Sequence, residues 1–248
     1  MDAAPGDRHR IAGAARDAGI DYAFVGAVPR EMDISSGDAR RSREGVRYLA
    51  RLCRLVREMG ASSVSGIFYG PMDAAPEPGK SRQFYLENSV RSMREVVKAA
   101  EDLGLTINLE VLNRFSQFIL NTARQAVEYV EMVGSPSLRI HLDTFHMNME
   151  EESIPAGIAA AAGRIGHFHA SENHRGLPGT GHIDFAAAAA ALRTAGYGGP
   201  VVIEAFVRAG FEFSQAFRVW RDQESGDVDD ALRRSLAHLR GIFDGGER

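Results

Sequence analysis

The sequence predicts an α/β fold with a parallel sheet, either open or closed into a barrel. Three observations support this. Short apolar segments alternate strictly with longer helical patterns, several helical patterns end at a glycine just before the next apolar segment, and no low-complexity linker divides the chain. We therefore expect a single domain over residues 1–248.

Six short apolar segments are the candidate strands: 20–28, 62–68, 106–111, 138–143, 165–170 and 200–206. Helical patterns are found at 8–18, 38–60, 81–103, 117–133, 153–163, 184–196 and 228–243. The glycines that end helical patterns are Gly60, Gly104, Gly134 and Gly196, as expected for C-caps. A closed (β/α)₈ barrel would need two further strands, so the sequence predicts an incomplete barrel or a shortened version of a longer chain.

Composition excludes several classes of protein. The chain is 44% hydrophobic and 25% charged, as in globular proteins, and its net charge of −4 offers no basic face for nucleic acid. No apolar stretch approaches the roughly 18 residues of a membrane span, and residues 1–10 lack a signal-peptide core. Cys53 is the one cysteine and lies on an apolar helix face, which predicts a buried thiol rather than a nucleophile. We expect a cytoplasmic protein with no nucleic-acid or membrane partner.

Residues suited to binding a metal stand at the ends of the last four predicted strands. They are Glu110, Asp143, His169 and Glu204, at intervals of 33, 26 and 35 residues. The carboxyl ends of barrel strands converge on one mouth, where unbalanced carboxylates would repel one another. A cation removes this repulsion, and three carboxylates with one imidazole suit Mn²⁺, Mg²⁺ or Co²⁺.

The alternation of side chains along a strand assigns two further histidines to the same region. His141 shares a face with Asp143, and His167 shares one with His169. We expect both to point into the barrel below the metal, as interior polar residues that support the site and not as ligands.

Five segments carry a resemblance to a known family: EVLNRF at 110–115, LDTFHMNMEE at 142–151, GHFHASENHRGLPGTG at 166–181, VIEAF at 202–206 and VWRD at 219–222. In order and spacing they resemble the ketose 3-epimerases, which act on D-psicose, D-tagatose and L-ribulose. The resemblance runs from about residue 20 to the C-terminus. It implies a TIM-type (β/α) barrel of the xylose isomerase-like superfamily, N-terminally shortened, with six of eight strands evident.

The resemblance also implies roles for individual residues. Glu110, Asp143, His169 and Glu204 would be the metal ligands, with Mn²⁺ expected first and Co²⁺ or Mg²⁺ as alternatives. Glu110 and Glu204 would be the acid–base pair that epimerises C3 of a free ketose through a cis-enediolate. His146, Arg175 and Ser116 would contact the sugar. Ser116 stands where the family usually carries an acidic residue, which leaves the identity of the ketose open.

The family tends to form dimers or tetramers, so we expect a homodimer or homotetramer. The segment 217–222, with Trp220, would then lie at a subunit contact or pack on the barrel.

Alternative functions remain. A related isomerase with a hydroxypyruvate or inosose-type substrate would use the same metal set. The loop Gly176–Gly181 would suit a phosphorylated substrate, although a tight turn explains it better. An inactive shortened barrel would bind only metal or sugar. A DNA-acting relative of this barrel would need more His and Asp ligands. A Schiff-base mechanism would need a lysine on a strand, whereas Lys80 lies in a predicted loop and Lys98 in a predicted helix.

Overall fold

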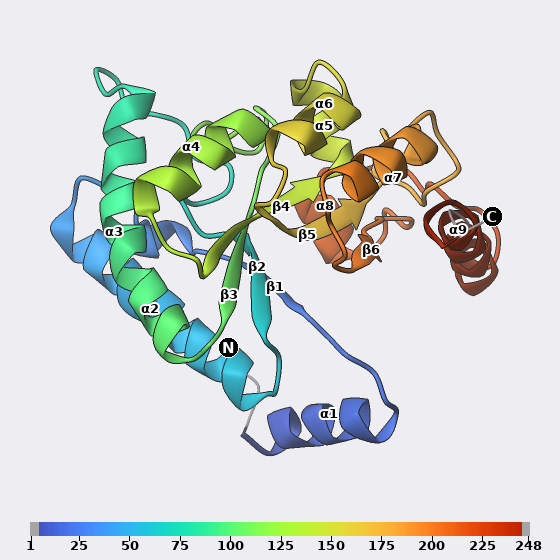
Figure 1. The fold of residues 1–248 in the computed structure, drawn as a ribbon, viewed down its shortest axis with the longest axis horizontal. Helices are drawn as coiled ribbons and strands as arrows, with labels where there is room; N and C mark the ends of the chain where they lie inside the picture. The colour runs from blue at the N-terminus through green and yellow to red at the C-terminus, as the bar shows by residue number, and fades with distance from the viewer. Residues whose placement is uncertain (1–4, 245–248) are drawn as a thin grey trace. The chain divides into compact units, whose positions relative to one another are not determined.

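The sheet consists of six parallel strands that follow one another in chain order. The computed structural model describes residues 5–244. The strands are β1 (Phe24–Ala27), β2 (Ser63–Ile67), β3 (Thr106–Glu110), β4 (Leu138–Asp143), β5 (Ile165–Ala170) and β6 (Val201–Ile203) (Figure 1). The predicted α/β fold with six strands of a (β/α) barrel is confirmed.

Helices separate the strands. They are α1 (Pro5–Asp17), α2 (Ala39–Glu58), α3 (Arg82–Asp102), α4 (Ala123–Val133), α5 (Thr144–Glu150), α6 (Ile154–Ala160), α7 (Phe185–Thr194), α8 (Glu212–Ala216) and α9 (Val228–Phe243), with a 3₁₀ helix η1 (Arg30–Met32). Each of the seven predicted helices is present. The short α5, α8 and η1 were not predicted, because a helix of three to seven residues shows too little periodicity to be recognised.

Some predicted boundaries were wrong. The helix expected over 117–133 begins only at Ala123, because the side-chain oxygen of Gln117 accepts the backbone N–H groups of Phe118 and Ile119 and holds that segment in a turn. The strand expected over 200–206 ends at Ile203, and the one expected over 20–28 covers only Phe24–Ala27.

The described residues group into two compact units. The first contains residues up to Asn121 together with Gln125–His141, and the second contains Thr122–Arg124 and the residues from Leu142 onward. Strand β4 therefore begins in the first unit and ends in the second. The prediction of a single domain over residues 1–248 stays a prediction.

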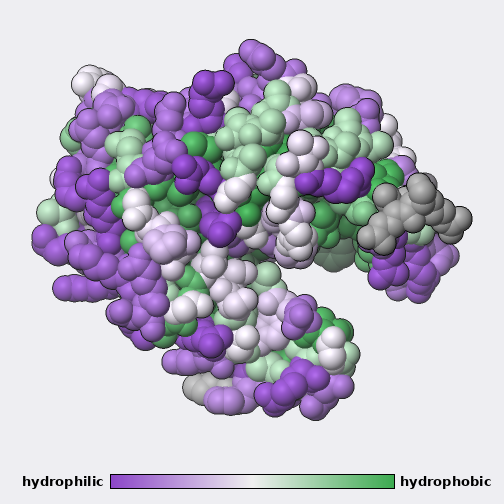
Figure 2. Space-filling model, viewed as in Figure 1, coloured by the Kyte–Doolittle hydropathy of each residue, from purple (hydrophilic) through white to green (hydrophobic). Residues whose placement is uncertain are grey.

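The first unit has an apolar core between its strands and helices. Its buried side chains from α2, β2, α3 and β3 include Val56, Val64, Met93 and Leu109. Cys53 is buried as well, and burial raises the pKa of its thiol to about 11, so the prediction of a buried thiol is confirmed. Hydrophilic side chains cover much of α2 and α3 on the outside (Figure 2).

The second unit has an apolar cluster around the end of β5. Ala170 at the end of β5, Phe185 at the start of α7 and Leu239 in α9 form a buried cluster that Val201 and Ile203 of β6 extend. In the β5–β6 register, His169 lies opposite Val202 and Ala170 opposite Ile203. This register brings the end of β5 next to the residue that follows β6, Glu204. Among the described residues, no helix is both long and apolar enough to cross a membrane.

Two glycines face each other where β1 pairs with β2. Gly26 lies opposite Gly66 in the register, and Gly66 has φ +139°. A Cβ atom on Gly66 would lie 1.9 Å from the carbonyl oxygen of Gly26. Any side chain at this position therefore has to push the two strands apart.

We expect Gly66→Ala to lower the free energy of unfolding by about 2–3 kcal/mol, as overpacking does. Urea denaturation followed by circular dichroism measures the change. The control is Gly241→Ala in α9, where a Cβ meets no atom within 4 Å and a gain of about 0.5–1 kcal/mol is expected. Equal stability of Gly66→Ala and the wild type would contradict the close approach of the strands.

Candidate metal centre

Asp143 ends β4 and at the same time begins α5. Its Oδ1 accepts the backbone N–H of Phe145 at 2.7 Å, which caps the helix. Its Oδ2 accepts a hydrogen bond from Arg175 Nη1 at 2.7 Å and lies 3.5 Å from His169 Nδ1. Asp143 is fully buried, so both oxygens are fixed by contacts inside the protein.

His169 and Glu204 complete a cluster with Asp143. His169 is the penultimate residue of β5, and Glu204 follows β6, where its N–H continues the ladder to the carbonyl of Ala170 at 3.1 Å. His169 Nδ1 and Glu204 Oε2 are 3.0 Å apart. One ligand-type atom from each of Asp143, His169 and Glu204 lies within 4.8 Å of the others. For these three residues, the predicted convergence of strand ends is confirmed.

Arg175 joins the two carboxylates of this cluster. Its Nη1 lies 2.7 Å from Asp143 Oδ2 and its Nη2 lies 2.8 Å from Glu204 Oε2. The guanidinium also lies over the rings of Phe145, at 4.6 Å, and Phe206, at 5.4 Å, which add cation–π contacts. The sequence placed Arg175 near the substrate but did not predict these contacts with the acids.

The charge of Arg175 determines the ionisation of Asp143. Burial alone would raise the pKa of this carboxyl. The nearby guanidinium of Arg175 and the hydrogen bond with His169 oppose burial and hold the pKa of Asp143 well below its usual range. Asp143 is therefore a carboxylate at neutral pH, which is the form that binds a cation.

His146 lies on α5, three residues after Asp143, and is only 5% exposed. Burial lowers its pKa to about 3, and this effect outweighs the opposite influence of Asp143. The imidazole is therefore neutral at physiological pH, with one nitrogen that donates a hydrogen bond and one that accepts.

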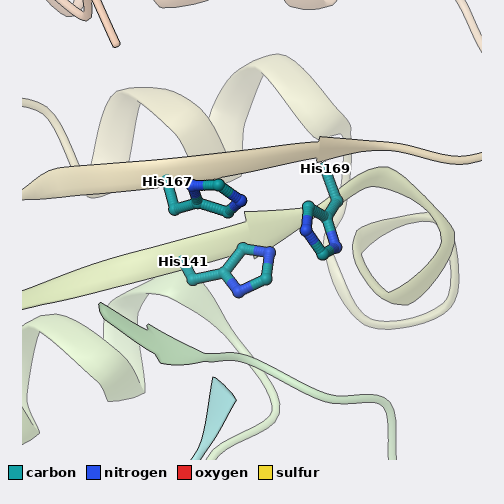
Figure 3. A group of neighbouring side chains, drawn as sticks. All are labelled: His141, His167 and His169. Carbon is teal, nitrogen blue, oxygen red and sulfur yellow. The ribbon is translucent and has the colours of Figure 1, made fainter. Parts of the chain in front are cut away.

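His167 and His169 project from the same face of β5, with ring centroids 5.0 Å apart (Figure 3). His167 is 2% exposed, and burial lowers its pKa to about 4. His141, two residues before Asp143 on β4, is fully buried. The prediction that both His141 and His167 are interior residues is confirmed.

Two predicted site residues lie in the first unit. Glu110 ends β3, is 4% exposed, and lies opposite His141 in the β3–β4 register; its Oε2 is 3.9 Å from His141 Nδ1. Ser116 is partly buried in the turn after β3, where its carbonyl accepts the N–H of Asp73 at 2.8 Å. The roles of both residues stay predictions.

Thr144 is a structural contributor that the sequence analysis missed. Its hydroxyl donates to the carbonyl of Ser171 at 2.6 Å and accepts the N–H of the same residue at 2.8 Å. Thr144 and Ser171 are both fully buried. These two hydrogen bonds link the residue after β4 to the residue after β5, and so fix Asp143 relative to His169. The one feature of the sequence that could have indicated this role is the position of Thr144 directly after Asp143.

The cluster suits a divalent cation. Its donors are two carboxylates and one imidazole, and Asp143 and His169 are buried while the side chain of Glu204 is 23% exposed. Neighbouring carboxylates repel one another and attract positive charge beyond that of Arg175, and oxygen-rich sets of this kind favour Mn²⁺, Mg²⁺ or similar ions. The residues present therefore fit a metal, whose identity the geometry does not specify.

The chain belongs to the xylose isomerase-like TIM barrel family, whose sequence profile matches residues 1–241. L-ribulose 3-epimerase from Mesorhizobium japonicum (strain LMG 29417 / CECT 9101 / MAFF 303099) is 36% identical over 224 residues, which cover 90% of this chain and 75% of the relative. D-psicose 3-epimerase from Ruminiclostridium cellulolyticum is 36% identical over 206 residues, which cover 82% and 70%.

Solved structures agree. The structure of D-psicose 3-epimerase with D-tagatose from Clostridium cellulolyticum H10 has a TM-score of 0.93 and 31% identity, and the match covers 97% of this chain and 85% of the other. The structure of an L-ribulose 3-epimerase has a TM-score of 0.92 and 34% identity, covering 99% and 82%. The predicted kinship with the ketose 3-epimerases, and with it the assignment to the isomerases, is confirmed.

We expect Thr144→Val to lower the free energy of unfolding by about 1–3 kcal/mol, because valine keeps the shape but leaves the buried N–H and carbonyl of Ser171 without the hydroxyl. Urea denaturation measures this loss. The matched control is Thr194→Val in α7, whose exposed hydroxyl donates to the carbonyl of Ala190 in the same helix. A Thr144→Val protein no less stable than the control would show that the link contributes nothing.

Proposed function

We propose that this chain is a divalent-metal-dependent ketose 3-epimerase that inverts C3 of a free ketose. The observation that carries the proposal is the cluster of Asp143, His169 and Glu204 at the ends of successive strands, in a chain whose relatives are ketose 3-epimerases. The substrates proposed are psicose, tagatose, fructose and ribulose, because the relatives are named for sugars of this class.

The proposed ligand set is Glu110, Asp143, His169 and Glu204. Glu110 ends β3 opposite His141, and His141 shares a strand face with Asp143 two residues later, which supports including Glu110. Three carboxylates against the guanidinium of Arg175 leave an excess of negative charge that a divalent cation balances. Mn²⁺ is the proposed ion, with Co²⁺ or Mg²⁺ as alternatives, since all three accept oxygen-rich sets.

The protein's own residues would divide the chemistry. When bound, the cation supplies positive charge that stabilises the enediolate form of the substrate. Glu204 and Glu110 are the proposed acid–base pair: one carboxylate takes the proton from C3, and the other returns a proton to the opposite face. Arg175 holds the carboxylate of Glu204 through Nη2, so its orientation is set before the substrate binds.

Substrate oxygens would be recognised by neutral and charged donors. His146 is buried and neutral, so it can donate a hydrogen bond to a hydroxyl without adding charge. Arg175 has a planar guanidinium with several donors, which suits neighbouring oxygens. Ser116, in the turn after β3, is the residue proposed to contact the far end of the sugar.

We also propose that the chain forms a single domain over residues 1–248. Two or four copies of this domain would assemble into a homodimer or homotetramer.

Solvent deuterium tests the reaction directly. Purified protein with Mn²⁺ or Co²⁺ is incubated in D₂O with fructose, psicose, tagatose, sorbose and ribulose, and NMR follows the products. We expect deuterium at C3 together with formation of the C3 epimer, because the returned proton comes from solvent. Deuterium at C1 with formation of an aldose would instead identify an isomerase. No exchange with any ketose by metal-loaded protein would refute the proposed reaction.

Replacing Glu204 by Gln should reduce exchange at C3 by more than about 100-fold, the range expected for removing an acid–base group. Glutamine keeps the size of the side chain but cannot accept the proton. The matched control is Glu212→Gln at the exposed start of α8, which should leave exchange unchanged. Exchange by Glu204→Gln at the rate of the wild type would remove Glu204 from the acid–base pair.

Calorimetric titration with Mn²⁺, after treatment with a chelator, tests the metal. We expect one ion per chain, and for Asp143→Asn an affinity at least about 100-fold lower, because removing a ligand costs more than the 10–100-fold typical of its supporting partners. Asp184→Asn, at the N-cap of α7, serves as the control and should bind metal normally. A wild-type protein that binds neither Mn²⁺, Co²⁺ nor Mg²⁺ would overturn the proposed centre.

A further inference from the structure

A buried acid outside the proposed ligand set lies in the loop that joins β5 to α7. Glu172 is 1% exposed, although it belongs to a connecting segment. Its Oε1 accepts the N–H of Gly179 at 2.9 Å. Its Oε2 accepts the N–H of Ile183 and that of Asn173, both at 3.3 Å. The carboxylate therefore accepts hydrogen bonds from backbone N–H groups at the beginning, the middle and the end of the loop.

The loop is shaped to approach this carboxylate closely. A Cβ atom on Gly181 would lie 2.4 Å from Glu172 Oε2 and 2.2 Å from Asn173 Oδ1. Glycine is therefore the residue that allows the returning chain to pass the acid. The N–H of His182 also donates to Asn173 Oδ1, at 3.2 Å. The segment that returns to α7 is therefore bound at two successive residues, His182 and Ile183, by the side chains of Asn173 and Glu172.

The backbone of Glu172 encloses Arg175 in a turn. The N–H of Arg175 donates to the carbonyl of Glu172 at 2.9 Å, and the N–H of Glu172 donates to the carbonyl of Gly176 at 3.2 Å. In this turn Arg175 has φ +67°, a conformation that residues other than glycine adopt only when their surroundings enforce it. The carbonyl of Arg175 is fixed in turn by the N–H of Phe206 at 2.9 Å.

The partners of Glu172 indicate a structural role for its carboxylate. Within the part of the chain that the structure describes, the carboxylate forms no ion pair, and both oxygens are occupied by backbone amides. A buried carboxylate is stable without a cation when such hydrogen bonds replace water. Its negative charge is therefore used to hold the loop.

We propose that Glu172 is a positioning residue: it fixes the loop 172–183 so that the guanidinium of Arg175 lies between Asp143 and Glu204. The effect on catalysis rests on the proposed function, whereas the effect on the loop does not. Glu172 acts through Arg175, and Arg175 through the two carboxylates that it joins.

The first test is independent of activity. In Glu172→Gln, a side-chain NH₂ group replaces one carboxylate oxygen and cannot accept a hydrogen bond from a backbone N–H, so one or two hydrogen bonds are lost. We expect hydrogen–deuterium exchange of the backbone amides of residues 173–183 to become about tenfold faster or more. Glu151→Gln is the matched control, because Glu151 also accepts a backbone N–H, from Ala123, in a different loop. Exchange in 173–183 that is equal in Glu172→Gln, the control and the wild type would overturn the proposal.

The second test asks whether Glu172 acts through Arg175. On a ketose that the wild-type protein epimerises, Glu172→Gln should lower kcat about tenfold or more, and Glu172→Asp should recover part of that loss. In an Arg175→Lys background, the further change Glu172→Gln should have less than about a twofold effect, because residues acting as one unit are not additive. Fully additive losses would contradict action through Arg175.

The two proposals fail in distinguishable ways. If the wild-type protein epimerises no ketose, the proposed function falls, while amide exchange still decides whether Glu172 holds the loop. If the wild-type protein is active and Glu172→Gln has normal kcat and a normally protected loop, the positioning role falls and the proposed function stands.

Discussion

The bridge from Arg175 to Asp143 and Glu204 is the interaction on which the rest of the site depends. Two carboxylates this close together, one of them fully buried, would repel each other, and the guanidinium between them makes the ionised form of Asp143 compatible with burial. The same contact keeps Asp143 deprotonated against the effect of burial. A site prepared for a cation thus contains one fixed positive charge of its own.

Contacts from several parts of the second unit fix the position of the Arg175 guanidinium. The rings of Phe145 and Phe206 contact the guanidinium, and Arg175 itself has a left-handed backbone in the turn around Glu172. The hydroxyl of Thr144 joins the ends of β4 and β5. Strand ends, helix starts and one loop therefore all determine where a single side chain lies.

The sequence was sufficient to predict the alternation of strands and helices, because glycine caps and apolar segments are local signals. It also predicted that Asp143, His169 and Glu204 converge, since parallel strands end at one edge of a sheet. It was insufficient for the contacts of Arg175, which depend on the path of a loop and on a backbone angle that no local pattern reveals. Helix α5 was missed because its seven residues show too little periodicity, although Asp143, recognised as a ligand, is also its N-cap.

The double use of Asp143 ties the acid to the helix that follows it. One oxygen caps α5 through Phe145, and the other meets Arg175, so the carboxylate cannot shift outward without breaking one of these bonds. His146 lies on that helix, one turn from the acid. Any displacement of the Asp143 carboxylate would therefore disturb the start of α5, and with it the helix that carries His146.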